Sequence, residues 1–323
     1  MKNQSYCTSS SGLALPLRNQ TRNAECPPLL SVFCWSYNNA IYIRQCIESI
    51  LDQETSFPVE IIIHDDCSND ETSSILDEYA SLYPTLFCNI VQDTNQWSQG
   101  LSVMTALFSS PLGKYVALTH ADDAWDDSSK LEKQVDFLES NAEYSFSFHD
   151  FIAVDKFGKK LRYPSLPEKF KRSYLADELS FFCHSRCWIP TVSLVYRNTL
   201  PNAEPPELKH VQNGDIFLVS LLGCYGPGYY QDDVRPALYR IHHGGTWSSL
   251  NSTRKLEEVS NTYFWLYKYY LRNSAESRAI HFRKQWFQCT ASLLHTRPLF
   301  TIAFNRFMAH LLQLLNIVFR FRS

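Results

Sequence analysis

The fold is decided by KYVALTHADDAWDD, residues 114–127, in which an apolar run ends in the adjacent carboxylates Asp122 and Asp123. Such a run is typical of a strand buried in a parallel sheet, and ligands bind beyond the carboxyl ends of these strands. Adjacent acids are costly to hold together unless a cation neutralises them. The pair therefore predicts a site for Mg²⁺ or Mn²⁺, which in turn bind phosphate oxygens. The alternative, acids at a helix N-terminus, is what we expect of Asp126 and Asp127.

Strand-like and helix-like segments alternate on both sides of this stretch. The expected strands are LLSVFCW (29–35), VEIIIHDD (59–66), LFCNIV (86–91), KYVALTH (114–120) and YSFSFHD (144–150). Helical patterns lie between them, as where Ile43, Ile47 and Ile50 recur at i, i+4 and i+7. Beyond about residue 151 the pattern loosens, with strand-like TVSLVY (191–196) and VRPALYRI (234–241). This alternation predicts an α/β fold with a mainly parallel central sheet flanked by helices.

Composition excludes several classes of protein. The 323 residues are 45% hydrophobic and 20% charged, which is enough for a sizeable core. The formal charge of −3 gives no sign of a nucleic-acid partner, which would favour a strongly basic domain. Only 10 residues are glycine, and neither G-x-G-x-x-G nor G-x-x-x-x-G-K-[ST] occurs, so a Rossmann turn, a kinase glycine loop and a P-loop are disfavoured.

Polar residues follow two further strands. Tyr37, in SYNN, could stack on a nucleobase, or it could be a core or turn tyrosine. Asp66 could accept hydrogen bonds from a nucleobase or ribose, or the acids there could cap the following turn.

Two more candidates lie in the second half of the chain. Asp215, in NGDIFL (213–218), could act as a general base on an acceptor hydroxyl, or it could cap a helix. His242, in YRIHHGGTWS (239–248), could contact a metal or phosphate, and the adjoining glycines would let a loop close over a ligand. A lone histidine is more often structural.

Together these clusters resemble the family 2 inverting glycosyltransferases of the GT-A fold, in particular the bacterial branch that builds surface polysaccharides. The resemblance is carried by the strand before SYNN, by VEIIIHDDCSNDET and by GKYVALTHADDAW followed by KLEKQVDFLESN. It extends from about residue 29 to 150 and, through NGDIFL and LYRIHHGGTWS, to about 248.

The resemblance implies a role for each candidate. Tyr37 and Asp66 would hold the nucleotide, in a pocket that Trp35 reshapes because relatives commonly carry a small residue there. The acidic pair corresponds to the family's D-x-D element, so that Asp122 would bind ribose and, with Asp123, the divalent metal that bridges the diphosphate. His242 is a further candidate ligand. Asp215 matches the base that deprotonates the acceptor hydroxyl.

One departure concerns the metal. His120 stands two residues before the pair, where many relatives carry an acid, which predicts a thinner or altered metal shell. The expected partners are a nucleotide-sugar donor and a glycan or lipid-linked sugar acceptor. A catalytically silent sugar-nucleotide-binding subunit is the alternative. A sugar-nucleotide-making nucleotidyltransferase is disfavoured because SYNNAIYIR contains no glycine-rich basic turn.

Three segments are expected: a flexible lead (1–27), a catalytic domain (28–250, with nucleotide-binding and acceptor halves that divide at 150/151) and a helical C-terminal region (251–323).

The 10 cysteines are scattered and the N-terminus has no apolar h-region, so we expect a reducing, cytoplasmic setting. Cys183 and Cys187 flank His184 and could suggest zinc, but no second ligand pair is present and ordinary thiols are favoured.

The end of the chain is basic. No acidic residue follows Glu276, and 13 uncharged, mostly apolar residues lie between Arg306 and Arg320, too few to cross a bilayer. Two interpretations stay open for this tail: a helix packed on the catalytic domain, or an amphipathic segment on the inner membrane leaflet.

Overall fold

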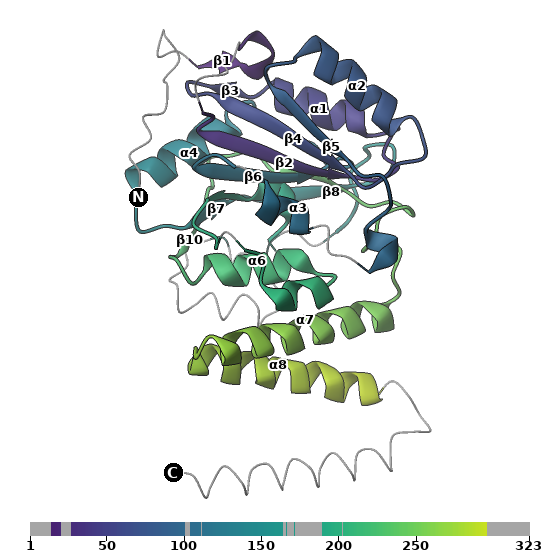
Figure 1. Ribbon diagram of the computed structural model, residues 1–323, viewed down its shortest axis with the longest axis vertical. Coiled ribbons are helices and arrows are strands. Elements are labelled where there is room, and N and C mark those ends of the chain that lie inside the picture. Colours follow the sequence, from purple (N-terminus) through teal and green to yellow (C-terminus); the bar gives the residue numbers. More distant parts are fainter. Residues whose placement is uncertain are drawn as a thin grey trace, which may run out of the picture. The chain divides into compact units, whose positions relative to one another are not determined.

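The structure, a computed structural model, describes residues 14–20, 27–100, 104–110, 112–163, 166, 171, 189–201 and 203–295. The chain divides into two compact units, Met1–Ser248 and Ser249–Ser323 (Figure 1).

A seven-stranded sheet forms the centre of the first unit, in the order β10-β7-β9-β6-β2-β4-β5. Its strands are β2 (Leu30–Ser36), β4 (Val59–Asp65), β5 (Phe87–Val91), β6 (Tyr115–His120), β7 (Phe146–Phe148), β9 (Val195–Arg197) and β10 (Gly228–Tyr230). All neighbours are parallel except β9, which runs antiparallel to both β6 and β7. The predicted α/β fold with a mainly parallel sheet is confirmed.

Helices cover both faces of this sheet (Figure 1). The helices and short helical turns are η1 (Leu17–Asn19), α1 (Ile43–Leu51), α2 (Thr72–Leu82), η2 (Trp97–Gln99), α3 (Met104–Ser109), α4 (Lys130–Ser140), η4 (Thr191–Ser193), η5 (Pro206–His210) and α6 (Gly214–Leu222). One large core joins the apolar sides of α1, α2 and α4 to alternate residues of the central strands, such as Val32, Cys34, Ile61 and Ile63. The side chains between them, such as Phe33 and Ile62, are also buried and point to the opposite face.

Two strands outside the main sheet matter for the site. β8 (Phe151–Val154) pairs in parallel with β11 (Ala237–Arg240). On its other side β11 forms an antiparallel bridge to Ala124, with the Leu238 N–H 2.8 Å from the Ala124 carbonyl and the Ala124 N–H 3.1 Å from that of Leu238. This bridge places β11 directly beside the acidic pair.

The expectation of a flexible lead is wrong for residues 14–20. β1 (Leu15–Pro16) pairs with β3 (Glu54–Thr55), and Leu17 is fully buried in the large core. Arg18 then pairs with Glu48 and Asp52. Leu17 and the ion pairs of Arg18 therefore hold this segment on the core. One buried residue is too short a pattern to be recognised as a periodic strand or helix in the sequence.

The segment 191–196 also differs from the expected strand. Its first half forms the 3-10 turn η4, because the Ser193 hydroxyl and N–H both donate to the Pro190 carbonyl, at 2.8 and 2.9 Å. Only Val195–Arg197 pairs as β9.

The described part of the second unit is a pair of helices, α7 (Ser252–Arg272) and α8 (Glu276–His295). The Asn251 side chain caps α7 by accepting the Arg254 N–H at 2.9 Å, and Tyr270 of α7 stacks on Phe282 of α8, with ring centroids 5.5 Å apart. Among the described residues, no helix combines the length and the apolar character needed to cross a membrane. Cys183 and Cys187, where ordinary thiols were favoured over zinc, and the basic tail from 296 onward lie outside the described residues.

Candidate active site

The candidate residues gather at one edge of the sheet because the strands that precede them run parallel. In the observed register Ser36 at the end of β2 lies opposite Asp65 on β4, and Trp35 lies opposite His120 on β6. Asp66 and Asp122 therefore follow strands on either side of β2. Two strand spacings separate these strands, roughly 10 Å.

Two loops form the side of the site that contains Tyr37 and Asp66. The Asn38 N–H donates to the Ser68 hydroxyl at 2.8 Å, and the Asn38 side-chain oxygen accepts the Asn69 N–H at 2.9 Å. Asn38 adopts a left-handed backbone (φ 52°), which asparagine tolerates better than most residues. These bonds hold the two loops together and leave Tyr37 46% exposed.

The two acids after β4 have different surroundings. Asp65 is fully buried and accepts hydrogen bonds from the Ser68 N–H and from the Ser68 and Ser73 hydroxyls, so it shapes the turn. Asp66 is 3% exposed, and its carboxylate accepts the N–H groups of Gln96 and Trp97 at 2.7 and 3.1 Å. Asp66 thus fixes the loop after β5, and this contact was not predicted.

Asp122 meets His242 across the site. The Asp122 Oδ2 and the His242 Nε2 are 3.0 Å apart, and the Asp122 side chain is 21% exposed. Burial alone would raise the pKa of Asp122, but the hydrogen bond from His242 and the charges of His120 and His242 outweigh it and lower the pKa. The structure therefore brings together two residues that lie 120 positions apart in the sequence.

Asp123 points inward instead. It is 3% exposed, and its Oδ1 accepts the Arg240 N–H of β11 at 2.8 Å. Burial, followed by the charge of Asp122, raises the pKa of Asp123 well above its usual range.

Arg240 ties the acidic pair to its surroundings, and this role was not predicted from the sequence. The side chain is 4% exposed; its Nε donates to the Asp122 carbonyl at 2.8 Å, its Nη1 to the Asp155 carbonyl at 2.9 Å and its Nη2 to the Gln45 side chain at 2.7 Å. The guanidinium also lies 4.8 Å from the centre of the Tyr42 ring, which in turn packs on His242. An arginine in the otherwise apolar run ALYRI was the available signal.

Trp35 on β2 lies opposite His120 on β6. It is 6% exposed, and its ring stacks on His120 with centroids 5.2 Å apart and planes inclined by 29°. His120 is thus held by an aromatic neighbour on the adjoining strand. Burial lowers the pKa of His120, although the charges of Asp122 and Asp215 oppose this shift.

Asp215 lies in the first turn of α6 and is half-buried. Its charge acts on His120 together with that of Asp122, and on Tyr239 together with those of Asp122 and Asp123, which places it near the acidic pair. The start of α6 packs closely on α3, because a Cβ on Gly214 would lie 2.5 Å from the Met104 Cγ.

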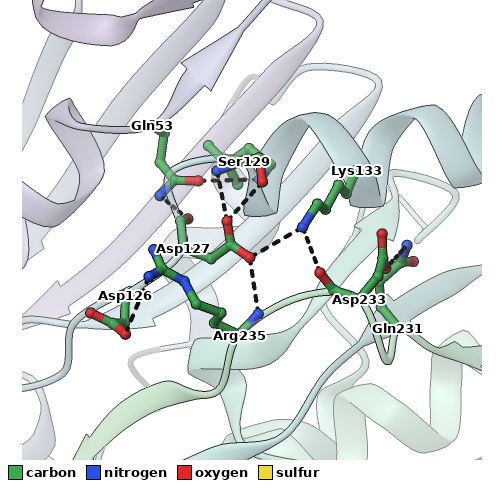
Figure 2. A network of polar contacts seen from close by, with 9 residues as sticks. Gln53, Asp126, Asp127, Ser129, Lys133, Gln231, Asp233 and Arg235 are labelled. Atoms are coloured by element: carbon green, nitrogen blue, oxygen red, sulfur yellow. Dashed lines mark hydrogen bonds and ion pairs between the residues drawn. The ribbon is translucent and has the colours of Figure 1, made fainter.

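A separate polar network surrounds Asp127 (Figure 2). The Asp127 carboxylate accepts hydrogen bonds from the Ser129 N–H and hydroxyl and from the Arg235 N–H, and it pairs with Lys133 at 3.3 Å. Asp126 is exposed and lies 4.0 Å from the Arg235 guanidinium. Asp127 therefore caps the turn that begins α4, as expected.

The donor set has the chemistry that a divalent cation requires when the substrate supplies further ligands. Asp122 and His242 offer one oxygen and one nitrogen, and Mg²⁺ commonly binds one or two carboxylates together with phosphates and water. The described residues contain no cluster of three or more His, Cys, Asp or Glu side chains that would hold a metal by themselves. The residues present thus fit a metal shared with a diphosphate, and they do not form a self-sufficient metal cage.

Comparison with known proteins shows the family of this chain. Residues 31–195 match the family described as Glycosyl transferase family 2. The chain belongs to this family. A Mycobacterium tuberculosis relative is 32% identical over 237 residues, covering 70% of this chain and 62% of the relative, so the chain spans less than two thirds of that protein. The putative teichuronic acid biosynthesis glycosyltransferase TuaG of Bacillus subtilis is 35% identical over 130 residues, 40% of this chain and 49% of that protein.

The fold is also shared with a solved structure. Staphylococcus aureus TarS 1-349 in complex with UDP-GlcNAc superposes with a TM-score of 0.52 at 16% identity, covering 83% of this chain and 81% of TarS. At this identity the likeness establishes the GT-A fold alone.

Proposed function

We propose that this glycosyltransferase moves a sugar from a nucleotide-diphosphate sugar to a hydroxyl of a glycan or lipid-linked acceptor, with inversion, in the synthesis of a bacterial surface polysaccharide at the cytoplasmic face of the membrane. The observation that carries the proposal is the Asp122–His242 pair, 3.0 Å apart at the carboxyl edge of the sheet, with Asp215 nearby. The name of TuaG supports the polysaccharide context.

In this proposal the donor lies along the sheet edge. Tyr37 is exposed and free to stack on the base, and Asp66 beside it retains acceptor capacity beyond its two backbone bonds. Trp35 is buried and stacks on His120, so its contribution to the nucleotide site would be to position that histidine. Roughly 10 Å of sheet edge then separates the base from Asp122, a span that a nucleoside can bridge to its diphosphate.

The divalent metal, Mg²⁺ or Mn²⁺, would be held by Asp122 and His242, whose ligating atoms lie 3.0 Å apart, together with oxygens of the diphosphate. Asp123, also expected as a ligand, is 3% exposed and has one oxygen engaged by the Arg240 N–H, so it would not complete the metal shell. When bound, such an ion neutralises charge on the leaving diphosphate.

Asp215 is proposed as the general base. A half-buried carboxylate in the first turn of α6 can accept the proton of an acceptor hydroxyl as that oxygen attacks the anomeric carbon. The bond to the nucleoside diphosphate breaks on the opposite face of the sugar. One displacement of this kind inverts the anomeric configuration.

A donor panel tests the proposal. Release of nucleoside diphosphate from UDP- and GDP-sugars is measured with Mn²⁺ and a lipid-linked or oligosaccharide acceptor pool, for the wild type and for Asp215→Asn. We expect turnover with the wild type, loss of at least about 100-fold in Asp215→Asn, and donor binding that is largely retained. Wild-type turnover in Asp215→Asn would remove it from the base role. Donor binding with no turnover by the wild type would favour the silent binding subunit.

The basic tail remains a proposed membrane contact. A chain truncated at about residue 296 that stayed equally membrane-bound in fractionation would contradict this role.

A further inference from the structure

The loop that follows β8 forms an ordered hairpin tip. Backbone bonds close it on both sides: the Asp155 N–H donates to the Lys159 carbonyl at 2.9 Å and the Leu161 N–H to the Ala153 carbonyl at 2.8 Å. The Asp155 carboxylate also accepts the N–H groups of Phe157 and Lys159, both at 2.9 Å. This is a stable turn whose tip has a defined conformation.

Gly158 lets the tip turn outward. Its backbone is left-handed (φ 83°), its N–H donates to the Asp155 carbonyl at 3.0 Å, and a Cβ there would meet nothing within 4 Å. The outer end of the turn, at Gly158, is therefore not packed against the described part of the molecule.

The surface of this tip is basic and apolar at once. Phe157 is 82% exposed, and the Lys156 Nζ lies 4.8 Å from its ring centre. Residues 156–163 contain four cations, Lys156, Lys159, Lys160 and Arg162, and no acid. No carboxylate of the described residues forms an ion pair with these four, in a chain whose net charge is −3. Contact of the Phe157 ring with water is unfavourable in free energy, because the ring is apolar. An exposed apolar side chain among unpaired cations, on an ordered turn, therefore indicates a surface that binds a partner.

We propose that this hairpin tip, residues 155–163, is a docking surface for an anionic lipid bilayer. Phe157 enters the boundary between headgroups and acyl chains, and the lysines and Arg162 meet the anionic headgroups. An acidic polymer would satisfy the cations but would leave Phe157 in water, so the exposed ring favours a bilayer.

The tip is joined to the acidic pair by a short chain of contacts. β8 pairs with β11, and the Arg240 side chain bonds both the Asp155 carbonyl at the base of the tip and the Asp122 carbonyl. Docking of the tip would thus hold the candidate active site at a fixed distance from the lipid surface. The proposal does not depend on the donor or on transfer, because its tests measure lipid contact directly.

Lysine footprinting on the full wild-type chain tests the proposal site by site. The protein is acetylated with a water-soluble ester in buffer, with phosphatidylcholine vesicles and with vesicles that contain phosphatidylglycerol, and each lysine is quantified by mass spectrometry. We expect acetylation of Lys156, Lys159 and Lys160 to slow about fivefold or more on anionic vesicles only, while the exposed Lys209 serves as internal control. Unchanged acetylation of the three, even if the protein binds the vesicles elsewhere, overturns the proposal. Protection by a soluble polyanion but not by vesicles also overturns it.

Charge reversal provides a second test. Lys159→Glu/Lys160→Glu is expected to lower the partition coefficient onto anionic vesicles about tenfold or more. The control Lys114→Glu/Lys209→Glu changes the net charge equally and should have a much smaller effect. An equal loss in both variants would mean unspecific attraction and would contradict docking at this tip.

Discussion

Replacement of Arg240 by methionine tests how the site is held together. The side chain is 4% exposed and donates three hydrogen bonds, to the Asp122 and Asp155 carbonyls and to Gln45, at 2.7 to 2.9 Å. Hydrogen bonds from a charged donor contribute about 1.5–3 kcal/mol each, so three of them amount to at least about 4.5 kcal/mol. Methionine avoids the cost of burying a charge, which offsets part of the loss. We therefore expect Arg240→Met to lower the free energy of unfolding by about 3 kcal/mol.

Urea unfolding of the full chain measures this effect, and calorimetry with Mn²⁺ and nucleoside diphosphate measures its consequence at Asp122. Arg235→Met is the matched control. The Arg235 side chain is 62% exposed, and its ion pair with Asp126 is long at 4.0 Å. We therefore expect the free energy of unfolding to change by less than about 0.5 kcal/mol. Weaker nucleotide binding should accompany the Arg240 variant alone. A loss below about 1 kcal/mol with unchanged nucleotide binding would refute the role assigned to Arg240.

Two further predictions concern buried positions. Burial lowers the pKa of Lys130 to about 7, although the charge of Asp127 opposes this shift. Between pH 7 and about 10.4, the lysine pKa in the unfolded chain, only the unfolded state keeps the proton. The free energy of unfolding of the wild type should therefore rise by about 1.4 kcal/mol per pH unit in this range. Lys130→Met should lose this rise. Urea unfolding at pH 7.5 and 9.5 should then give a change in unfolding free energy between the two pH values that is about 2–3 kcal/mol larger in the wild type than in the variant. An equal change in both proteins would contradict the prediction. Gly214→Ala should destabilise by about 1–3 kcal/mol because its Cβ would lie 2.5 Å from the Met104 Cγ. The added change Met104→Ala should restore transfer activity in part if displacement of α6 is the cause, and a stable, fully active Gly214→Ala would contradict the close packing.

Five strands of the central sheet, β2, β4, β5, β6 and β7, were predictable because they are largely apolar runs, of which Leu30–Ser36 is an example. The short edge strand β10 (Gly228–Tyr230) was not predicted. The location of the acidic pair followed from the rule that the carboxyl ends of parallel strands meet at one edge. Both features depend on local sequence and on one general property of parallel sheets.

The remaining features depend on contacts between distant residues. Arg240 acquires its role only because β11 bridges to Ala124, and no local pattern predicts that pairing. The two-residue strand β1 is likewise too short for periodicity, so the docking of Leu17 could not be foreseen. The burial of Trp35 beneath His120 depends on the register of β2 against β6.

Calorimetric titration of UDP and GDP into the full chain, with Mn²⁺ and with EDTA, tests the central claim most directly, alongside Asp122→Asn. The claim is that Asp122 and His242, 3.0 Å apart, bind a nucleoside diphosphate through a shared divalent ion. We predict that one nucleotide binds with Mn²⁺ and that EDTA or Asp122→Asn weakens this binding about tenfold or more. Binding of equal strength with Mn²⁺, with EDTA and in the variant would contradict the claim.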